Sequence, residues 1–279
     1  MMRVFTLLAF VLPQSVSAQT TARVDSFYSP SISSTSQYAY LLPERYDSLH
    51  AYPILYLLHG YGGNHRNWTE LTNLSTYSAP LGLIIIMPNG GNSWYVNSMG
   101  RPSDRYEDMI ITDLRRHIEH RFRVDTTRRA IAGLSMGGYG AIMLALCHPQ
   151  LFCFAGSLSG ALSIPGSMEF SERNRPERSL TNLKVVFGAE KALHKQHDLF
   201  ALYRNTIPES LPRLYFVIGT NDGFATFLPA HRALSDSLRS YGARYEYHET
   251  PGAHNWKYWE KEIQPLLRRM VEVFHERNR

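Results

Sequence analysis

Residues Ile131-Ala132-Gly133-Leu134-Ser135-Met136-Gly137-Gly138-Tyr139-Gly140-Ala141 form an apolar run that stops at a serine and continues with helical spacing. The centre of the run has the pattern Gly-x-Ser-x-Gly, which is typical of a strand that ends in a tight turn and exposes a serine hydroxyl before a helix begins. Gly133 and Gly137 flank the serine, where side chains would crowd the turn. Three fixed residues occur by chance in about one chain in ten of this size, so the pattern needs partners elsewhere in the sequence.

Apolar runs after residue 50 predict the strands of a mostly parallel sheet. Runs that are apolar on both sides suit strands covered by helices on both faces, and they occur at 53–58, 83–87, 129–134, 154–158, 184–187 and 214–218. Helical spacing of apolar residues separates several of these runs, at 105–122, 136–146, 198–204, 227–241 and 256–277. Because strand and helix alternate, we expect right-handed βαβ units and an α/β fold. Two antiparallel strands are expected within 24–42, and a last strand at 244–249.

The first 18 residues differ from the rest of the chain. Arg3 gives a positive start, residues 4–12 are apolar but too few to cross a bilayer, and Val16-Ser17-Ala18 ends in small residues. This combination is typical of a cleaved signal peptide, so we expect a secreted or periplasmic protein; the alternative is a buried N-terminal strand. Residues 19–279 have the length and composition of a single α/β domain.

The charge and the hydropathy exclude two classes of partner. The formal net charge is +5, from 29 basic and 24 acidic residues, and removal of Arg3 with the signal leaves +4. The basic residues occur singly or in pairs such as Arg115-Arg116, whereas binding to nucleic acid or to a membrane surface needs a denser basic patch. No later apolar run approaches about 18 residues, so we expect no membrane span.

The two cysteines, Cys147 and Cys153, lie six positions apart. Export permits a disulfide between them. Both residues also suit buried apolar positions, and we favour inert core thiols over a bridge.

A nucleophilic serine needs a histidine as general base and an acid that orients the histidine. Asp222 and His254 follow Ser135 in the order serine, acid, histidine that an α/β-hydrolase requires, and each lies in a glycine-containing loop after a predicted strand. Loops at one edge of a parallel sheet are where ligands bind. We therefore predict Ser135, Asp222 and His254 as a catalytic triad. Glu190 and Asp198 are the alternative acids.

Attack on a carbonyl carbon produces an oxyanion that two backbone N–H groups must stabilise. The residue after the nucleophile, Met136, begins the predicted helix and is the first expected donor. The second expected donor is Tyr61 in the loop His59-Gly60-Tyr61-Gly62-Gly63, whose glycines let bare N–H groups face a substrate.

Five stretches together make the sequence similar to the esterase D-like family of α/β-hydrolases. They are LLHGYGG at 57–63, NSWYVNS at 92–98, YED at 106–108, GLSMGG at 133–138 and PGAHNW at 251–256. The resemblance spans residues 35–275, about nine-tenths of the mature chain. It implies an α/β-hydrolase fold, the triad and the oxyanion donors named above, and a place for Trp94 in the substrate cleft. The family includes feruloyl and acetyl-xylan esterases, tributyrin-type carboxylesterases, S-formylglutathione hydrolases and mycolyltransferases.

Two of these subfamilies fit the sequence less well. S-formylglutathione hydrolases have a cysteine-containing loop where this chain has residues 59–63, and export also argues against a glutathione substrate. Mycolyltransferases usually have aspartate in place of His59 and glutamate as the triad acid. The secreted feruloyl or acetyl-xylan type and the small-acyl carboxylesterase type remain.

The sequence therefore predicts a secreted serine carboxylesterase that needs no metal or cofactor. Short or aromatic acyl esters of carbohydrates are the expected substrates, because aromatic rings near the cleft suit sugar or phenolic groups; these rings are Tyr61, Trp94, Tyr95, Trp256 and Tyr258. Core packing explains the same aromatics equally well. The alternatives are an acyltransferase with a sugar or lipid acceptor and a non-catalytic carbohydrate-binding relative. The sequence does not fix the oligomeric state, and the long stretch 159–182 is typical of a lid or a binding wall.

Overall fold

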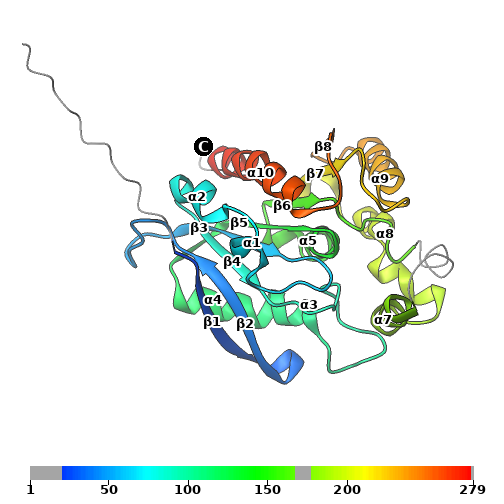
Figure 1. Cartoon of the computed structure of the whole chain (residues 1–279), viewed down its shortest axis with the longest axis horizontal. Helices are drawn as coiled ribbons and strands as arrows, with labels where there is room; N and C mark the ends of the chain where they lie inside the picture. The colour runs from blue at the N-terminus through cyan, green and yellow to red at the C-terminus, as the bar shows by residue number, and fades with distance from the viewer. Residues whose placement is uncertain (1–20, 167–176, 278–279) are drawn as a thin grey trace, which may run out of the picture.

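A computed structural model describes residues 21–166 and 177–277, which contain an eight-stranded sheet with the order β1-β2-β4-β3-β5-β6-β7-β8 (Figure 1). β1 and β2 form an antiparallel hairpin, β2 is antiparallel to β4, and the strands from β4 to β8 run parallel. The predicted mostly parallel α/β sheet is therefore confirmed. The strands are β1 (Arg23–Ser29), β2 (Ser34–Leu41), β3 (Tyr52–Leu58), β4 (Ile84–Pro88), β5 (Val124–Leu134), β6 (Phe154–Leu158), β7 (Arg213–Gly219) and β8 (Tyr245–Thr250).

Helices cover both faces of the sheet. One face packs against α1 (Asn67–Glu70), α2 (Leu74–Ser78) and α10 (Trp256–Glu276). The other packs against a π-helical segment (Met109–Leu114), α4 (Arg115–Arg121), α5 (Met136–Cys147), α7 (Glu177–Phe187), α8 (Leu199–Leu202) and α9 (Phe227–Tyr241). The remaining helices are α3 (Tyr106–Asp108) and 3-10 turns at Pro30–Ile32, Ala79–Leu81, Pro149–Leu151, Lys191–His197, Tyr203–Asn205 and Pro208–Ser210.

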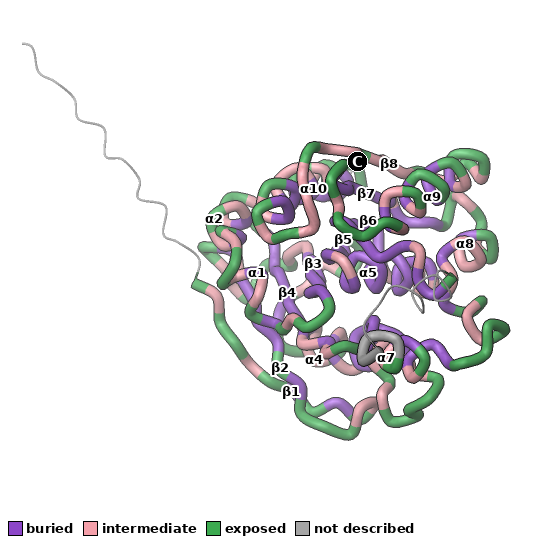
Figure 2. Tube along the Cα trace, turned by 45° about the vertical axis from the view of Figure 1, so that its right-hand side comes forward, coloured by how far each residue is buried: buried purple, intermediate pink, exposed green. Residues whose placement is uncertain are grey.

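The core has two parts because side chains alternate across each strand. In β3, Ile54, Tyr56 and Leu58 belong to one apolar cluster, whereas Leu55 and Leu57 belong to the other. Burial of each such side chain stabilises the fold by about 1.5–3 kcal/mol. Figure 2 shows that the central strands and α5 are buried while the outer loops are exposed.

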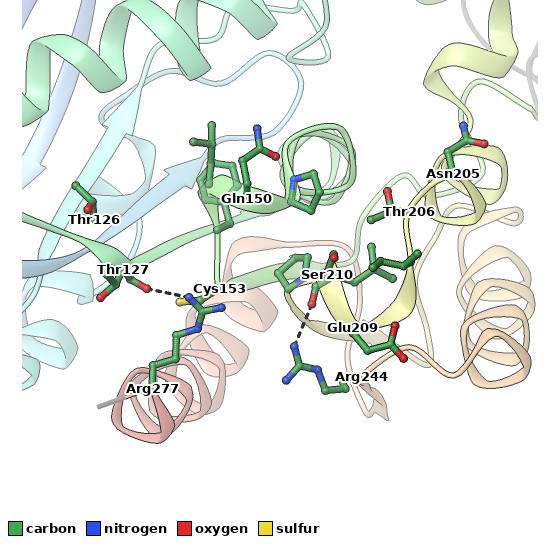
Figure 3. A pocket seen from close by; sticks show the side chains of 16 residues that line it. Thr126, Thr127, Gln150, Cys153, Asn205, Thr206, Glu209, Ser210, Arg244 and Arg277 are labelled. Atoms are coloured by element: carbon green, nitrogen blue, oxygen red, sulfur yellow. Dashed lines mark hydrogen bonds between the residues drawn. The ribbon is translucent and has the colours of Figure 1, made fainter. Parts of the chain in front are cut away.

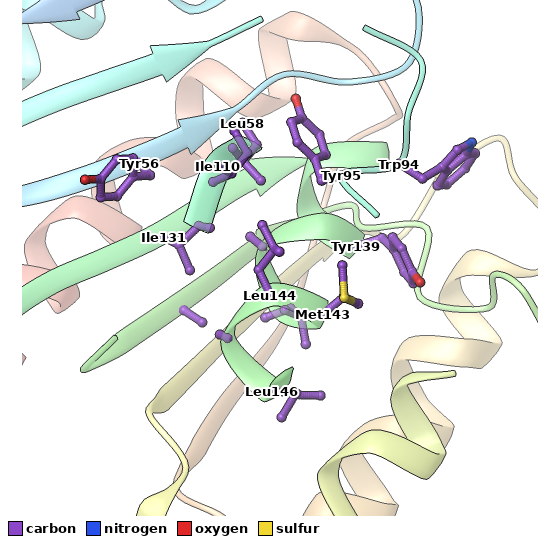
Figure 4. Packing of buried hydrophobic residues seen from close by; sticks show 14 of the residues in the cluster. Tyr56, Leu58, Trp94, Tyr95, Ile110, Ile131, Tyr139, Met143, Leu144 and Leu146 are labelled. Atoms are coloured by element: carbon purple, nitrogen blue, oxygen red, sulfur yellow. The ribbon is translucent and has the colours of Figure 1, made fainter. Parts of the chain in front are cut away.

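Helix α5 is buried on every side and lies close to the strands. A Cβ added to Gly137 would lie 2.6 Å from the carbonyl oxygen of His59 and 2.7 Å from that of Leu58. The apolar residues of α5, Tyr139 and Leu144 among them, belong to the same apolar cluster as Trp94 (Figure 4). Glycine at 137 thus lets the helix begin against the end of β3, which brings Ser135 next to the loop after that strand.

The prediction of a strand at 184–187 is wrong. These residues form the last turn of α7, and Leu183, Val186 and Phe187 are buried in the core. Their spacing of three and four residues is that of a helix face, although Val185 and Val186 favour strands when considered alone. The helix expected at 198–204 exists in a shorter form, with α8 followed by a 3-10 turn.

Several predictions concern residues that are described only in part. The expected signal peptide at 1–18 lies outside the described residues, as does the centre of the stretch 159–182.

Both thiols are free: Cys147 contacts Met143, and Cys153 donates to the carbonyl of Arg129. Burial raises the pKa of Cys147 to about 12 and that of Cys153 to about 11. Every helix in the described residues is too short or too polar to cross a membrane.

Candidate active site

Ser135 lies between β5 and α5 in a strained turn. Its φ of 52° and ψ of −116° are unusual for a residue with a side chain, and such a conformation costs on the order of 1–3 kcal/mol. The turn is held by neighbouring backbone: the Ser135 N–H donates to Leu158 O at 3.0 Å, and the Ser135 carbonyl accepts from Ala161 at 3.1 Å. The result is a serine hydroxyl raised above the carboxyl edge of the sheet, as the Gly-x-Ser-x-Gly pattern predicts.

Ser135, His254 and Asp222 form a continuous chain of hydrogen bonds. The Ser135 hydroxyl lies 3.0 Å from His254 Nε2, and His254 Nδ1 lies 2.7 Å from Asp222 Oδ2. A carboxylate only accepts, so Nδ1 carries the imidazole proton and Nε2 is free to accept from the serine. The other Asp222 oxygen accepts from the Phe224 N–H at 3.1 Å, and the Asp222 side chain is 0% exposed.

Two loops hold the acid and the base together. Asp222 follows β7 and His254 follows β8, and the loops are joined by backbone bonds from Thr220 to Thr250 and from Asn221 to Gly252, each 2.9 Å long. These bonds continue the pairing of β7 with β8 beyond the sheet. The distance between the two side chains is therefore set by backbone rather than by flexible side chains.

Aromatic rings enclose the imidazole of His254. The centroids of Phe224, Trp259 and Phe227 lie 4.7, 4.9 and 5.6 Å from the His254 ring, all in edge-to-face arrangements. Only 13% of the His254 side chain is exposed. Packing of this kind limits rotation of the ring and keeps bulk water away from its hydrogen bonds.

The two expected oxyanion donors lie on either side of Ser135. Met136 is the first residue of α5, and Tyr61 lies in the loop after β3, where a Cβ added to Gly60 would be 3.5 Å from Ser135 Cβ. Within residues 21–166 and 177–277, the backbone N–H groups of Tyr61 and Met136 have no hydrogen-bond partner. Both groups are thus available to a ligand at Ser135.

An aromatic pocket of about 420 Å³ opens beside Ser135. Its lining includes Ser135, His254 and four aromatic residues, namely Tyr61, Phe224, Trp256 and Trp259. Tyr61 and Phe224 are the most exposed of these four residues, at 41% and 43%, and this exposure places them at the mouth of the pocket.

The other aromatics named from the sequence lie in the core. Trp94 is 3% exposed; among the described residues it contacts Tyr61, Tyr139 and Phe187, and it does not belong to the pocket lining. Tyr95 and Tyr258 are also buried. Of the two tryptophans predicted to bind substrate, Trp256 therefore lines the pocket and Trp94 lies behind Tyr61.

A larger cavity of about 560 Å³ lies near the opposite end of the sheet (Figure 3). Its two arginines are engaged with backbone: Arg277 donates to the carbonyl of Thr127 and Arg244 to that of Leu211. The lining includes buried Cys153 but no histidine. Among the described residues, the lining offers no histidine to act as base for a nucleophile, so we place the candidate active site at Ser135.

Three residues of the pocket were not found from the sequence. Phe224 and Trp259 contact His254, and Asn67 lines the wall beyond the loop 59–63. Phe224 follows Asp222 by two positions, and this nearness to the predicted acid was the one feature of the sequence that could have placed it in the pocket. Trp259 and Asn67 lie on helices whose faces cannot be assigned to a pocket before the packing is known. In the described residues, no three metal-binding side chains converge.

A family model described as "Putative esterase" matches residues 29–270. The chain belongs to this esterase family. The esterase is 28% identical over 231 residues to an acetyl esterase from Caldicellulosiruptor saccharolyticus, which covers 78% of this chain and 83% of the relative. It is 30% identical over 242 residues to Esterase Rv1288 from Mycobacterium tuberculosis, covering 77% of this chain but 51% of that protein, so it spans about half of that relative.

The esterase is also similar in structure to FphF, a fluorophosphonate-binding serine hydrolase from Staphylococcus aureus. The TM-score is 0.79 at 24% identity, with 91% of this chain and 99% of that chain covered. The fold is thus the α/β-hydrolase fold that was predicted, and the family identifies the protein as a carboxylesterase-type hydrolase.

Proposed function

We propose that this esterase is an exported serine carboxylesterase of one domain, residues 19–279, that works through a Ser135–His254–Asp222 triad. The observation that carries the proposal is the chain of hydrogen bonds from Ser135 through His254 to buried Asp222, beside two backbone N–H groups that have no partner in the described part of the chain. Ser-His-acid geometry of this kind activates a hydroxyl that is otherwise a poor nucleophile.

The geometry suggests a two-step reaction. His254 Nε2 takes the hydroxyl proton as Ser135 Oγ bonds to the ester carbonyl carbon, and the N–H groups of Tyr61 and Met136 stabilise the oxyanion. His254 then gives the proton to the leaving alcohol as its C–O bond breaks, which leaves an acyl-serine. A water molecule repeats the sequence, losing a proton to His254, and releases the acid as the proton returns to Ser135.

The substrates proposed are short or aromatic acyl esters of carbohydrates. Support comes from the four aromatic rings of the pocket, of which Tyr61 and Phe224 stand at the mouth, where a sugar or phenolic ring can stack on them. The acetyl esterase among the relatives supports a short acyl group. The proposed export brings the enzyme to polymers that do not enter cells.

The role of Ser135 is tested first with p-nitrophenyl acetate. Ser135→Ala is expected to lower kcat by at least about 10⁴-fold, because the acyl-enzyme cannot form. Ser163→Ala is the matched control, because the Ser163 hydroxyl bonds to Thr226 and not to a histidine, and it is expected to keep the wild-type rate. A fluorophosphonate probe should label the wild type and Ser163→Ala but not Ser135→Ala. If the wild type is not labelled at Ser135, the carbohydrate-binding alternative replaces the enzyme.

The substrate class is tested by comparing p-nitrophenyl acetate, methyl ferulate and acetylated xylan. Activity on either plant-type ester supports the carbohydrate proposal, and inactivity on both overturns it. Product analysis with a sugar or lipid acceptor present decides between free acid, as expected here, and a transferred acyl group, which would make the protein an acyltransferase.

A further inference from the structure

His59 connects two loops at the active site although it does not face the pocket. It follows β3, its side chain is 1% exposed, and both ring nitrogens are engaged: Nε2 lies 3.0 Å from the Gly90 N–H, and Nδ1 lies 2.8 Å from the Gly60 carbonyl oxygen. Gly60 immediately precedes Tyr61, which carries one of the proposed oxyanion donors. The ring therefore bonds directly to the peptide that supplies that donor.

The partners of His59 determine its tautomer. A backbone N–H only donates, so Nε2 must accept from Gly90 and carries no proton. The single proton of a neutral imidazole is then on Nδ1, which donates to the Gly60 carbonyl. Burial lowers the pKa of His59 to about 4, so this arrangement persists at neutral pH.

The bond to Gly60 fixes the direction of the next N–H group. In a planar trans peptide the C=O and the N–H point in opposite directions. Because the Gly60 carbonyl points toward buried His59, the Tyr61 N–H points away from the core, on the side where the pocket lies. The Gly63 N–H also donates to the Gly60 carbonyl, at 3.0 Å, and closes the loop in the same orientation.

We propose that His59 is a positioning residue: its Nδ1–H holds the Gly60–Tyr61 peptide so that the Tyr61 N–H is aimed at the oxyanion above Ser135. This inference rests on the proposed function, in which that N–H stabilises the transition state. It adds a residue that touches neither substrate nor nucleophile and that acts through one hydrogen bond.

The loop after β4 provides the fixed support for this arrangement. Gly90 belongs to that loop, and so does Asn92, whose Oδ1 accepts from the Gly62 N–H at 2.7 Å. The Tyr95 hydroxyl donates to the His59 carbonyl at 3.0 Å. Trp94 and Tyr95 both have positive φ, 59° and 60°, a strain that persists only where surrounding contacts determine the backbone. The peptides on both sides of Tyr61 are thus tied to one rigid loop.

Two substitutions separate the two hydrogen bonds of the ring. His59→Asn places an amide nitrogen near the position of Nδ1 and keeps a donor for Gly60, while His59→Gln places its amide near the position of Nε2 and keeps a partner for Gly90 only. With p-nitrophenyl acetate, we expect His59→Gln to lower kcat by about 10- to 100-fold with KM within about twofold. The loss of a whole oxyanion donor costs about 10²–10³-fold, and a misdirected donor costs less. His59→Asn should partly rescue kcat, losing several-fold less.

Controls separate positioning from stability. His197→Gln makes the same change at another buried histidine, whose ring nitrogens lack hydrogen-bond partners in the described residues, and it is expected to keep the wild-type kcat. Asn92→Ala removes the acceptor of the Gly62 N–H by changing an exposed side chain rather than a buried one. It should lower kcat several-fold. The affinity for a trifluoromethyl ketone, which forms a tetrahedral oxyanion on serine, should fall in parallel with kcat in the His59 variants and in Asn92→Ala, and it should stay unchanged in His197→Gln.

Each outcome decides between the two roles. A normal kcat in His59→Gln, or equal losses in His59→Gln and His59→Asn that follow Tm, overturns the positioning role, while loss of activity in Ser135→Ala leaves the proposed function standing. If Ser135→Ala keeps its activity, the proposed function itself is wrong, and the positioning role fails with it.

Discussion

Asp222 accepts hydrogen bonds on both carboxylate oxygens, from the His254 ring and from the Phe224 N–H. Asp222→Asn keeps the shape but offers His254 an amide that can donate, which favours the imidazole tautomer with its proton on Nε2. That tautomer cannot accept from Ser135, so kcat on p-nitrophenyl acetate is expected to fall by roughly 10³–10⁴-fold with little change in KM. Asp198→Asn is the matched control. Asp198 caps α8 through the Phe200 N–H, and asparagine caps about as well as aspartate.

The two variants decide between Asp222 and Asp198, which the sequence offered as the predicted acid and one alternative. We expect Asp198→Asn to stay within about twofold of the wild-type rate. If Asp198→Asn loses activity and Asp222→Asn does not, the acid has been assigned incorrectly.

Residue order and loop position were enough to place Ser135, Asp222 and His254 in one hydrogen-bonded chain. Chain order carries that information because each residue follows a parallel strand, and the carboxyl ends of such strands meet at one edge. The same reasoning could not separate Trp256, which lines the pocket, from Trp94, which is buried behind Tyr61. Which way an aromatic ring turns depends on packing between elements that are far apart in the sequence.

Helix α5 depends on glycine where it meets β3. In Gly137→Ala the new Cβ would lie 2.6–2.8 Å from backbone atoms of His59 and Leu58, which cannot move as a side chain can. We expect a loss of about 1–3 kcal/mol in the free energy of unfolding, measured by urea denaturation. Gly223→Ala is the control, because nothing lies within 4 Å of its new Cβ. Equal stability of the two variants would contradict the close packing of α5 on β3.

Helix α7 shows where prediction of the elements fails. Val185, Val186 and Phe187 have strand propensity, but Leu183, Val186 and Phe187 pack as one helical face, and Phe187 contacts Trp94. Tertiary contacts overrode the local preference. The β-strands around α5 were predicted correctly because an apolar run on both faces has few alternatives other than a covered parallel strand.

The sequence predicted a mostly parallel sheet but not the order of the strands within it. β3 follows β2 in the chain, yet β4 lies between them. Continuous apolar runs show that a strand is covered on both faces, and they carry no information on which neighbour pairs with it. Because β3 lies between β4 and β5 in the sheet, the loop after β3 lies between the loops after β4 and β5. In this position His59 can bond to Gly90, and Gly60 can lie next to Ser135.

Two buried histidines, His59 after β3 and His231 in α9, link the stability of the molecule to pH. Burial lowers the pKa of both His59 and His231 to about 4, although for His231 the carboxylates of Asp222 and Glu249 act in the opposite direction. Between pH 4 and the ordinary histidine pKa of about 6.5, the unfolded chain binds a proton at each site and the folded chain does not. The free energy of unfolding therefore rises with pH in this window. On acidification it falls by about 1.4 kcal/mol per pH unit for each histidine.

His231→Gln removes one of these two sites. Between pH 7 and pH 5, the two histidines are expected to lower the free energy of unfolding of the wild type by about 4 kcal/mol. In His231→Gln the decrease is expected to be about 2 kcal/mol smaller. Urea denaturation at pH 7, 6 and 5 gives the free energy of unfolding of each protein as a function of pH. The contributions of groups that both proteins share cancel in the difference between the two slopes. His120→Gln, at an exposed position, should keep the wild-type dependence. Parallel slopes for the wild type and His231→Gln would mean that His231 is protonated equally in the folded and unfolded chains, contrary to the effect expected from its burial.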